Sequence, residues 1–438
     1  MQLKISRIFH AGYLFEYEGT TIAFDPLFEN PFSKNCYVFP EVELDTSPLP
    51  ELKLDAIFIS HYHDDHFSLT SLNLLDRQIP IYIFSLFEEL LDLIRALGFT
   101  KVYPIEILRP ISIGPLEVRP LEALDSDVDS LYHIKVAGLN ILHVVDSWIG
   151  PATMKILSRT KTWDLILWPM QTMREIEVIA PSTAEPITPQ TQELPPEWIE
   201  QLQQLNPLAV VPSSCQFRFE EWSWYNHAFF PISYTQFTKQ IQSALPNVKV
   251  HTVHPGESLE YHAANFYRGA RLPWIKPCGD QNVDYKFNPP SLPPSIAEIS
   301  RHLSSLNEDQ RQHVHTFCIK TLYERFSQLA TFEESWFSTP QSWLLALYDQ
   351  QGGARHYHYQ IHGNKMTQAP DHSSWTWMTE IAECKLFAAL YEGESLTSIY
   401  VRVTPPPQAD PLEDPLIRCL YEGVIGGYQK AQLEKIRT

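Results

Sequence analysis

The stretch SHYHDDHFS (residues 60–68) restricts the fold more than any other part of the sequence. It concentrates three histidines and two aspartates, and it directly follows the apolar run LDAIFIS (residues 54–60). A short apolar run that ends in a polar cluster is typical of a buried strand. The chain is therefore expected to place a group of metal-binding side chains at the end of a strand in the core of an α/β domain.

The spacing within this stretch suits metal binding. His61 and His63 are two residues apart, so an extended backbone presents both rings on one face. Asp65 and His66 follow where the chain leaves the strand, and they can reach a second point nearby. Imidazole and carboxylate ligands together suit zinc, iron or manganese. The alternative is a polar loop whose histidines bond one another or face solvent, which would fit a lone histidine better than this cluster.

These residues resemble a known signature. The run from His61 to His66 matches the HxHxDH motif of the metallo-β-lactamase superfamily. The segment HAGYLFEYEGTTIAFDPLF (residues 10–28) is similar to the opening strand meander of that superfamily, in which an aspartate, here Asp25, closes an apolar strand. The resemblance covers residues 1–262. It implies an αββα sandwich with a two-metal site at one edge of its sheets.

The resemblance also implies a ligand set. The motif would supply two ligands to the first metal ion and two to the second, in the order His61, His63, Asp65, His66. A bridging aspartate follows a later strand in these proteins, and a last histidine comes from a loop late in the domain. The matching positions are Asp146 in ILHVVDS and His227 in WSWYNHAFFPISY. Taken alone, Asp146 also fits a turn-capping carboxylate, and His227 also fits a packed side chain.

One position departs from the pattern of the superfamily's hydrolases, which supply a further histidine to the first metal ion before the bridging aspartate. The corresponding segment, residues 121–138, has no histidine before its final strands but has four acidic residues: Glu122, Asp125, Asp127 and Asp129. Asp125 is the preferred replacement, because it lies where the missing histidine would fall relative to Asp146. A solvated acidic loop is the alternative reading. His133 lies on a strand and fits a structural role.

This composition of ligands leads to two enzymatic hypotheses. The first is a hydrolase that binds two divalent metal ions, zinc first, and uses a metal-bound hydroxide, oriented by Asp65 or Asp146, on an ester, lactone or phosphoester. The second is a diiron oxygenase on the same fold, because a carboxylate in place of imidazole favours iron or manganese. Such an oxygenase would need a separate redox partner. A binding protein that has lost activity is a third hypothesis, and the complete motif argues against it.

Four residues are candidates for contact with a small-molecule substrate. His10 matches a position near the site in the lactonase and phospholipase-like branches, although a plain turn residue is equally consistent. Tyr62 lies within the motif, and it also fits a packed aromatic side chain at the strand end. Trp224 and Tyr225 belong to an aromatic cluster beside His227 that could wall an apolar pocket or simply pack in the core.

After the first domain, the composition and the pattern of the sequence change. Residues 263–295 are rich in proline and are predicted to be a linker. Residues 296–438 alternate helix and strand patterns and are predicted to form a smaller α+β domain. Its layout resembles that of sterol-carrier-like domains, which would imply an apolar ligand; a dimerisation or lid domain is the alternative. A homodimer is compatible with either reading.

Charge, hydropathy and cysteine content restrict which partners and which surroundings are expected for the protein. The net charge of −19 argues against nucleic acid, because binding phosphates needs a positive surface. No apolar run approaches the roughly 20 residues needed to span a bilayer. The six cysteines are far apart and include no CxxC pair, which indicates reduced thiols. The expectation is a cytoplasmic protein without a membrane span.

Overall fold

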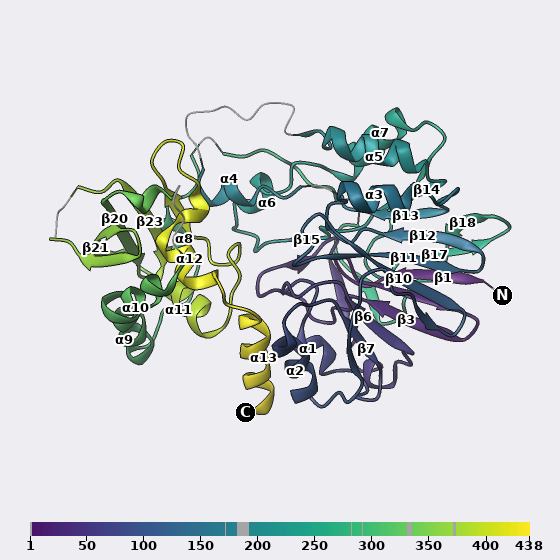
Figure 1. Cartoon of the computed structure of the whole chain (residues 1–438), viewed down its shortest axis with the longest axis horizontal. Coiled ribbons are helices and arrows are strands. Elements are labelled where there is room, and N and C mark those ends of the chain that lie inside the picture. The colour runs from purple at the N-terminus through teal and green to yellow at the C-terminus, as the bar shows by residue number, and fades with distance from the viewer. Residues whose placement is uncertain are drawn as a thin grey trace.

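The structure is a computed structural model that describes residues 2–170, 172–181, 192–281, 283–290, 292–330, 335–370 and 374–438. Its N-terminal part contains two large sheets and its C-terminal part a third, smaller one (Figure 1). None of the described helices is both long and apolar enough to cross a membrane.

The first sheet has eight strands in the order β18-β17-β1-β2-β3-β6-β7-β8. The predicted opening meander forms its antiparallel half, and the strand before the histidine-rich motif is β6, which pairs parallel to β3. The strands are β1 (Leu3–Arg7), β2 (Tyr13–Tyr17), β3 (Thr20–Phe24), β6 (Ala56–Ile59), β7 (Ile81–Ile83), β8 (Val102–Pro104), β17 (Ser258–His262) and β18 (Asn265–Arg268).

The second sheet has seven strands in the order β16-β14-β13-β12-β11-β10-β9. Its strands are β9 (Ile111–Ile113), β10 (Leu116–Glu122), β11 (Ser130–Val136), β12 (Leu139–His143), β13 (Leu165–Trp168), β14 (Ala209–Pro212) and β16 (Lys249–Val250). Helices α3 (Pro151–Leu157), α5 (Pro196–Leu205) and α7 (Tyr234–Ala244) lie beside this sheet, and α1 (Leu69–Leu72) and α2 (Glu88–Ala96) lie beside the first (Figure 1).

Strand alternation explains how both faces of the first sheet are buried. In β6, Ala56 and Phe58 join the apolar layer between the two sheets, whereas Ile57 and Ile59 join the layer that includes the helices. Across the inner layer the ring of Phe24 in β3 lies 5.0 Å from that of Tyr132 in β11. Two sheets with helices on both outer faces confirm the predicted αββα sandwich.

The predicted linker, residues 263–295, is largely packed onto the first domain. Its first residues form β18, and Ile275–Pro277 form β19, which pairs with β5 (Val42–Leu44). Tyr285 is 8% exposed, and its hydroxyl group donates a hydrogen bond to Phe217 O at 2.6 Å. Buried aromatic and apolar side chains thus attach a proline-rich segment to the sandwich. A further pair, β4 (Tyr37–Val38) with β15 (Phe217–Arg218), lies near this attachment.

The C-terminal part forms the predicted second, α+β domain. Its sheet has the order β22-β21-β20-β23-β24, with β20 (Gln341–Tyr348), β21 (Ala354–His362), β22 (Lys365–Gln368), β23 (Trp377–Ala382) and β24 (Arg402–Thr404). Its helices are α8 (Ile296–Ser300), α9 (Glu308–Thr316), α10 (Leu322–Gln328), α11 (Glu383–Tyr391) and α12 (Pro415–Tyr421). The likeness to sterol-carrier domains stays a prediction.

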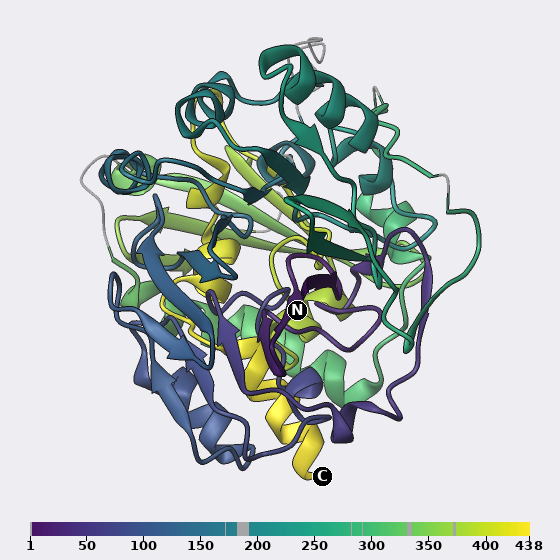
Figure 2. The same ribbon diagram turned by 90° about the vertical axis from the view of Figure 1, so that its right-hand side faces the viewer.

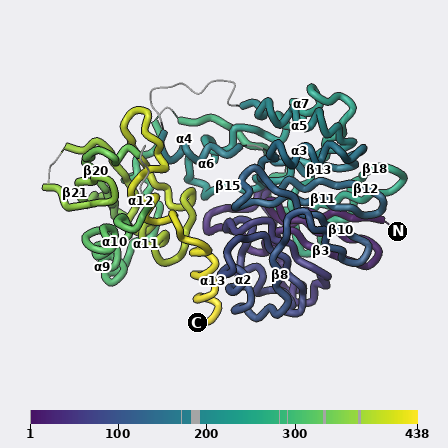
Figure 3. The backbone as a smooth tube through the Cα atoms, viewed as in Figure 1, coloured from purple at the N-terminus to yellow at the C-terminus, as the bar shows by residue number. Residues whose placement is uncertain are grey.

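The last helix returns to the first domain. Helix α13 (Gly427–Arg437) leaves the C-terminal domain and packs against α1 and α2. The tube view shows it beside α2 (Figure 3). Turned by 90°, the molecule shows this helix running out beside the first sheet to the C-terminus (Figure 2). The helix therefore brings the end of the chain to the segment that follows the histidine-rich motif.

Candidate metal centre

The polar side chains meet at one edge of the sandwich because several strands end there. Asp25 follows β3, the histidine-rich motif follows β6, and Asp146 follows β12. His10 lies in the turn between β1 and β2, with a positive φ of 45°. Asp25 and Cys215 also have positive φ, at 39° and 60°. Such conformations are costly for residues other than glycine, and they cluster at functional sites.

Two groups of potential ligand atoms lie at this edge, and within each group the atoms lie within 4.8 Å of one another. The first group consists of His61, His63 and Asp129. The second consists of His10, Asp65, His66 and Asp146. Five of the seven predicted ligands are therefore brought together, and two residues join them that had not been predicted as ligands.

A hydrogen-bond chain sets the tautomer of His61. The Ser60 hydroxyl group donates to Asp25 Oδ2 at 2.6 Å, so its oxygen must accept the hydrogen bond from His61 Nδ1 at 2.9 Å. His61 therefore carries its proton on Nδ1. Its Nε2 lone pair is left free to bind a cation.

Asp25 orients His66 in the same way. His66 Nδ1 lies 3.0 Å from Asp25 Oδ2 and donates to it, because a carboxylate can only accept. The other ring nitrogen, Nε2, lies 3.0 Å from Asp146 Oδ2. This nitrogen therefore also carries a proton, which it donates to Asp146. A cation would displace that proton and leave a neutral ring with its hydrogen on Nδ1, so His66 also presents Nε2 to the centre. Asp25, only 1% exposed, supports both imidazole ligands without facing the centre itself.

His10 has the opposite tautomer. The backbone N–H of Cys215 donates to His10 Nδ1 at 3.2 Å, and this nitrogen must therefore be unprotonated. The neutral ring then carries its proton on Nε2, which faces the second group at 3.2 Å from Asp65 Oδ2. A protonated nitrogen cannot bind a metal ion. In this arrangement His10 is a hydrogen-bond donor within the group, and Asp65, His66 and Asp146 remain as its potential ligands.

The electrostatics of the first group suit a cation. Burial and the neighbouring His66 hold the pKa of His61 well below its usual value, so the ring is neutral. Burial and the charge of Asp146 raise the pKa of Asp129 to about 6. Asp129 Oδ1 is buried, has no hydrogen-bond partner among the described residues, and lies 3.8 Å from His61 Nε2. Two donors at about 2.0–2.2 Å from one ion can be separated in this way, so the residues fit a bound metal ion.

Asp146 stays ionised between the two groups. Burial opposes its charge, but the neighbouring His66 and the hydrogen bonds from His10 and His66 hold the pKa of Asp146 well below its usual value. It is therefore a carboxylate at neutral pH. Its position, close to His66 and at the end of β12, is the one predicted for it.

The acidic residue in the first group is Asp129, and the predicted Asp125 lies outside the group. The backbone N–H of Asp129 donates to Asp125 O at 2.9 Å, so the segment makes a turn that separates the two side chains. Asp125 is exposed, whereas Asp129 is anchored by the Ser147 hydroxyl group at 2.9 Å. Position in the sequence alone did not distinguish the two aspartates. Asp129 directly precedes β11, whose first residues are buried at this edge of the sheet.

His227 lies outside both ligand groups. It is exposed on α6 (Tyr225–Ala228), and its Nδ1 lies 3.2 Å from Lys286 O in the former linker segment. The second group instead contains His10, whose backbone carbonyl accepts a hydrogen bond from Arg7 Nε at 2.9 Å. The sequence feature that could have indicated that His10 lies in this group is the HxG turn at residues 10–12.

The other predicted substrate contacts separate into two kinds. Tyr62 is half-buried beside His63, with ring centroids 5.5 Å apart, and lines a cavity. His10 lies within the second group. Tyr225 is buried and packs against Tyr400 of the C-terminal domain at 4.7 Å, and the half-buried Trp224 packs on Tyr225 at 5.1 Å. Packing between the domains therefore accounts for both of these aromatic side chains.

Comparison with known proteins agrees with this fold. Residues 4–213 match the family model described as a beta-lactamase superfamily domain. This part of the chain therefore resembles β-lactamase superfamily domains in sequence. The paired sheets and the motif after β6 are thus the metallo-β-lactamase fold expected from the sequence. A search of curated proteins returns no significant match.

Several solved structures are similar to part of this chain. A metallo hydrolase from Ignicoccus hospitalis is 18% identical, covering 60% of this chain and 99% of its own, with a TM-score of 0.38. A diiron β-hydroxylase from Streptomyces venezuelae is 17% identical, covering 59% of this chain and 54% of its own, with a TM-score of 0.41. A metallo-β-lactamase fold protein from Bacillus subtilis is 14% identical, covering 58% and 98%, with a TM-score of 0.40.

Proposed function

We propose that the chain is a two-metal hydrolase that cleaves an ester, a lactone or a phosphoester. The observation that carries this proposal is the Nε2–H of His10, which lies inside the second ligand group, 3.2 Å from Asp65 Oδ2. Ester cleavage needs a proton donor at this place, because the leaving oxygen departs as an alcohol only when it gains a proton.

The residues of the centre divide the work as follows. Two divalent ions, zinc first, would polarise the scissile carbonyl or phosphoryl group and lower the pKa of the attacking water when bound. Asp65 accepts a proton from the attacking water, and His10 gives its Nε2 proton to the leaving oxygen as the bond to that oxygen breaks. Asp65 then returns its proton to His10 Nε2 across 3.2 Å. One water is consumed, and an acid and an alcohol are released.

A second candidate function rests on Asp129. With Asp65, Asp129 and Asp146 the centre holds three carboxylates, which harden it towards iron or manganese. A diiron oxygenase that receives its electrons from a separate reductase is the corresponding alternative. It shares the ligands but has no need of a proton donor at His10 for a leaving group.

Metal content and rates distinguish the two functions. The protein is purified without added metal, its metal content is measured by elemental analysis, and the zinc-, manganese- and iron-loaded forms are assayed on p-nitrophenyl acetate, γ-butyrolactone and bis-(p-nitrophenyl) phosphate. We expect about two ions per chain and hydrolysis of at least one substrate. Two irons with a coupled-diiron signal, reductant-dependent oxygen uptake and no hydrolysis would establish the oxygenase instead.

The variant His10→Gln tests the proton donor. We expect two metal ions to remain bound, because His10 is not a ligand. The rate should fall by about 10² to 10⁴ on an alkyl ester, and far less on a p-nitrophenyl ester, whose leaving group needs no proton. Loss of one metal ion from the variant would show that His10 binds metal, and an equal fall on both esters would remove its role as acid.

A further inference from the structure

A cavity of about 420 Å³ lies between the metal centre and the C-terminal domain. Tyr62, His63 and Asp64 of the metal-binding motif form one wall. The opposite wall comes from the ends of α11 and α12 and the start of α13, more than 300 residues away in the sequence. His63, a member of the first ligand group, is exposed, so the centre is accessible from this cavity.

The opposite wall presents mainly apolar and aromatic surface. Leu390, Tyr391, Leu420, Tyr421 and Val424 contribute to it. Tyr391 is 49% exposed and Val424 is 48% exposed, although both are large and largely apolar. The hydroxyl group of Tyr421 donates to a backbone carbonyl at 2.8 Å, which leaves its ring as the available surface.

Three charged residues of this wall, Glu394, Lys430 and Arg325, are already engaged. Glu394 pairs with Lys385 at 2.8 Å, and both are buried. Lys430 Nζ donates to Ile425 O at 2.8 Å, and Arg325 donates to Cys419 O at 3.4 Å. These contacts reduce the polar capacity of the wall. They favour a ligand that offers apolar surface rather than charge.

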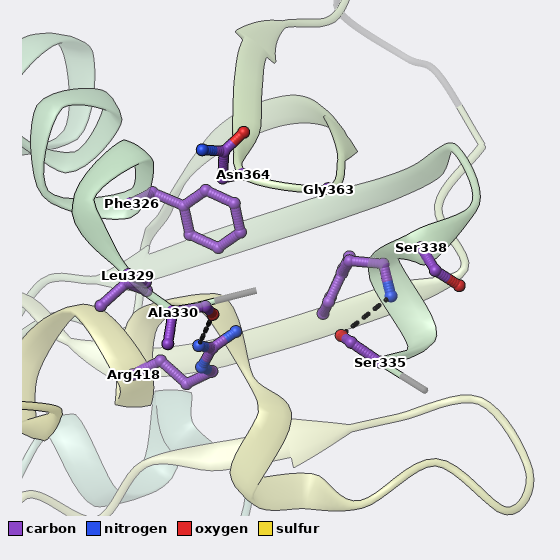
Figure 4. Close-up of a pocket in the computed structure, with 9 residues that line it drawn as sticks. Phe326, Leu329, Ala330, Ser335, Ser338, Gly363, Asn364 and Arg418 are labelled. Carbon is purple, nitrogen blue, oxygen red and sulfur yellow. Dashed lines mark hydrogen bonds between the residues drawn. The ribbon is translucent and has the colours of Figure 1, made fainter. Parts of the chain in front are cut away.

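A second cavity, inside the C-terminal domain, has a different character. It lies among Phe326, Leu329 and Arg418, which donates to Ala330 O at 2.6 Å (Figure 4). Its volume is about 30 Å³, which is room for a water molecule and not for an organic ligand. The larger cavity is within the range of about 300–1,000 Å³ typical of small-molecule sites.

We propose that the larger cavity binds the apolar portion of the substrate, a medium-length alkyl or aryl group, and presents the adjoining ester carbonyl to the centre at His63. This inference rests on the proposed hydrolase function for the reacting end of the substrate. It assigns the choice of substrate to the C-terminal domain. Each methylene group that enters the cavity adds hydrophobic binding energy, so longer acyl groups are preferred.

The acyl-chain preference tests this proposal. We expect kcat/KM on p-nitrophenyl octanoate to exceed that on p-nitrophenyl acetate by at least about tenfold, since burial of the added methylenes favours binding. Val424→Asp and Tyr391→Ser should reduce this ratio several-fold. The matched control is Leu208→Asp, which places the same charge at a 56% exposed leucine on the first domain and should leave the ratio unchanged. A ratio that is equal in all four proteins would overturn the proposal.

A binding measurement separates failure of this inference from failure of the hydrolase proposal. The neutral fluorophore N-phenyl-1-naphthylamine is titrated into the chelator-treated, full-length protein. We expect saturable binding that weakens at least about fivefold in Val424→Asp and not in Leu208→Asp. If the probe binds in this way and no ester is cleaved, the cavity stands and the hydrolase fails. If esters of all lengths are cleaved equally and the probe binding is unaffected by Val424→Asp, the cavity assignment fails and the hydrolase stands.

Discussion

Asp25 shows how a residue outside the ligand set can decide what the centre binds. It accepts from Ser60 and from His66, and through these contacts it turns both His61 and His66 so that Nε2 faces the centre. The backbone N–H of Cys215 can only donate, so it fixes the opposite tautomer in His10, with the proton on Nε2. Proton positions on three rings are thus set by three fixed partners, and they separate potential ligands from a proton donor.

At the scale of single residues, the identity of Asp129 is predicted to control which metal the centre prefers. Replacing the carboxylate in Asp129→His gives the first group three imidazoles, which suits zinc better than iron. We expect the ratio of zinc to iron in protein refilled from an equimolar mixture to rise at least about fivefold. The same substitution at the exposed neighbour, Asp125→His, should leave the ratio unchanged. Equal ratios in the wild type and Asp129→His would show that Asp129 does not bind metal.

Among the elements, α13 has the most direct effect on the centre. Gln429 Nε2 donates to Tyr62 O at 3.0 Å and to Phe67 O at 2.8 Å, so one side chain holds both ends of the metal-binding segment. Gln432 adds a second clamp, accepting from Leu69 N at 2.7 Å and donating to Ser68 Oγ at 3.0 Å. The last helix of the chain therefore completes the support of a segment that follows β6.

This contact predicts a metal-binding defect from a distant substitution. In Gln429→Leu the two carbonyl groups lose their donor and the segment loses its anchor, so metal affinity should fall by about 10- to 100-fold, as for other outer contacts of metal ligands. Competition with a chelator of known affinity measures the change. Gln312→Leu, the same substitution at an exposed position on α9, is the control. An unchanged affinity in Gln429→Leu would limit α13 to a packing role.

At the scale of the whole molecule, the layer between the two sheets contains a buried histidine that makes stability depend on pH. His143 is 0% exposed at the end of β12, with its ring 5.4 Å from Tyr13 and 5.6 Å from Phe24. Burial lowers the pKa of His143 to about 4. Between pH 6.5 and 4 the unfolded chain therefore binds a proton at this residue and the folded chain does not, so stability is lost as the pH falls.

Replacing this histidine should remove that loss. Between pH 7 and pH 4 the difference in pKa corresponds to about 3 kcal/mol at most. Urea unfolding of the chelator-treated wild type and His143→Phe at pH 7, 6 and 5 gives the free energies to compare. The difference between them should shift in favour of the variant as the pH decreases. A difference that stays constant with pH would mean that the folded and unfolded states bind a proton at His143 equally.

The sequence by itself determined the order of the opening strands, the sandwich, and the cluster from His61 to His66, along with Asp146. These depend on local patterns: a buried strand shows its apolar run, and residues two apart share a face wherever the strand lies. The position of Asp146 followed from the same order of strands. The sequence also predicted a second, α+β domain, because helix and strand patterns alternate after the proline-rich segment.

The tertiary structure alone brought Asp129 rather than Asp125 to the first group and His10 rather than His227 to the second. It also attached the proline-rich segment and α13 to the first domain. A single turn of an acidic loop separates the two aspartates, and its direction depends on packing against Ser147 rather than on residue type. The turn that carries His10 is held by Arg7, three residues earlier, and by the backbone N–H of Cys215, which is 205 positions away. The contact from Cys215 to His10 joins residues more than 200 positions apart, and no local pattern in the sequence predicts it.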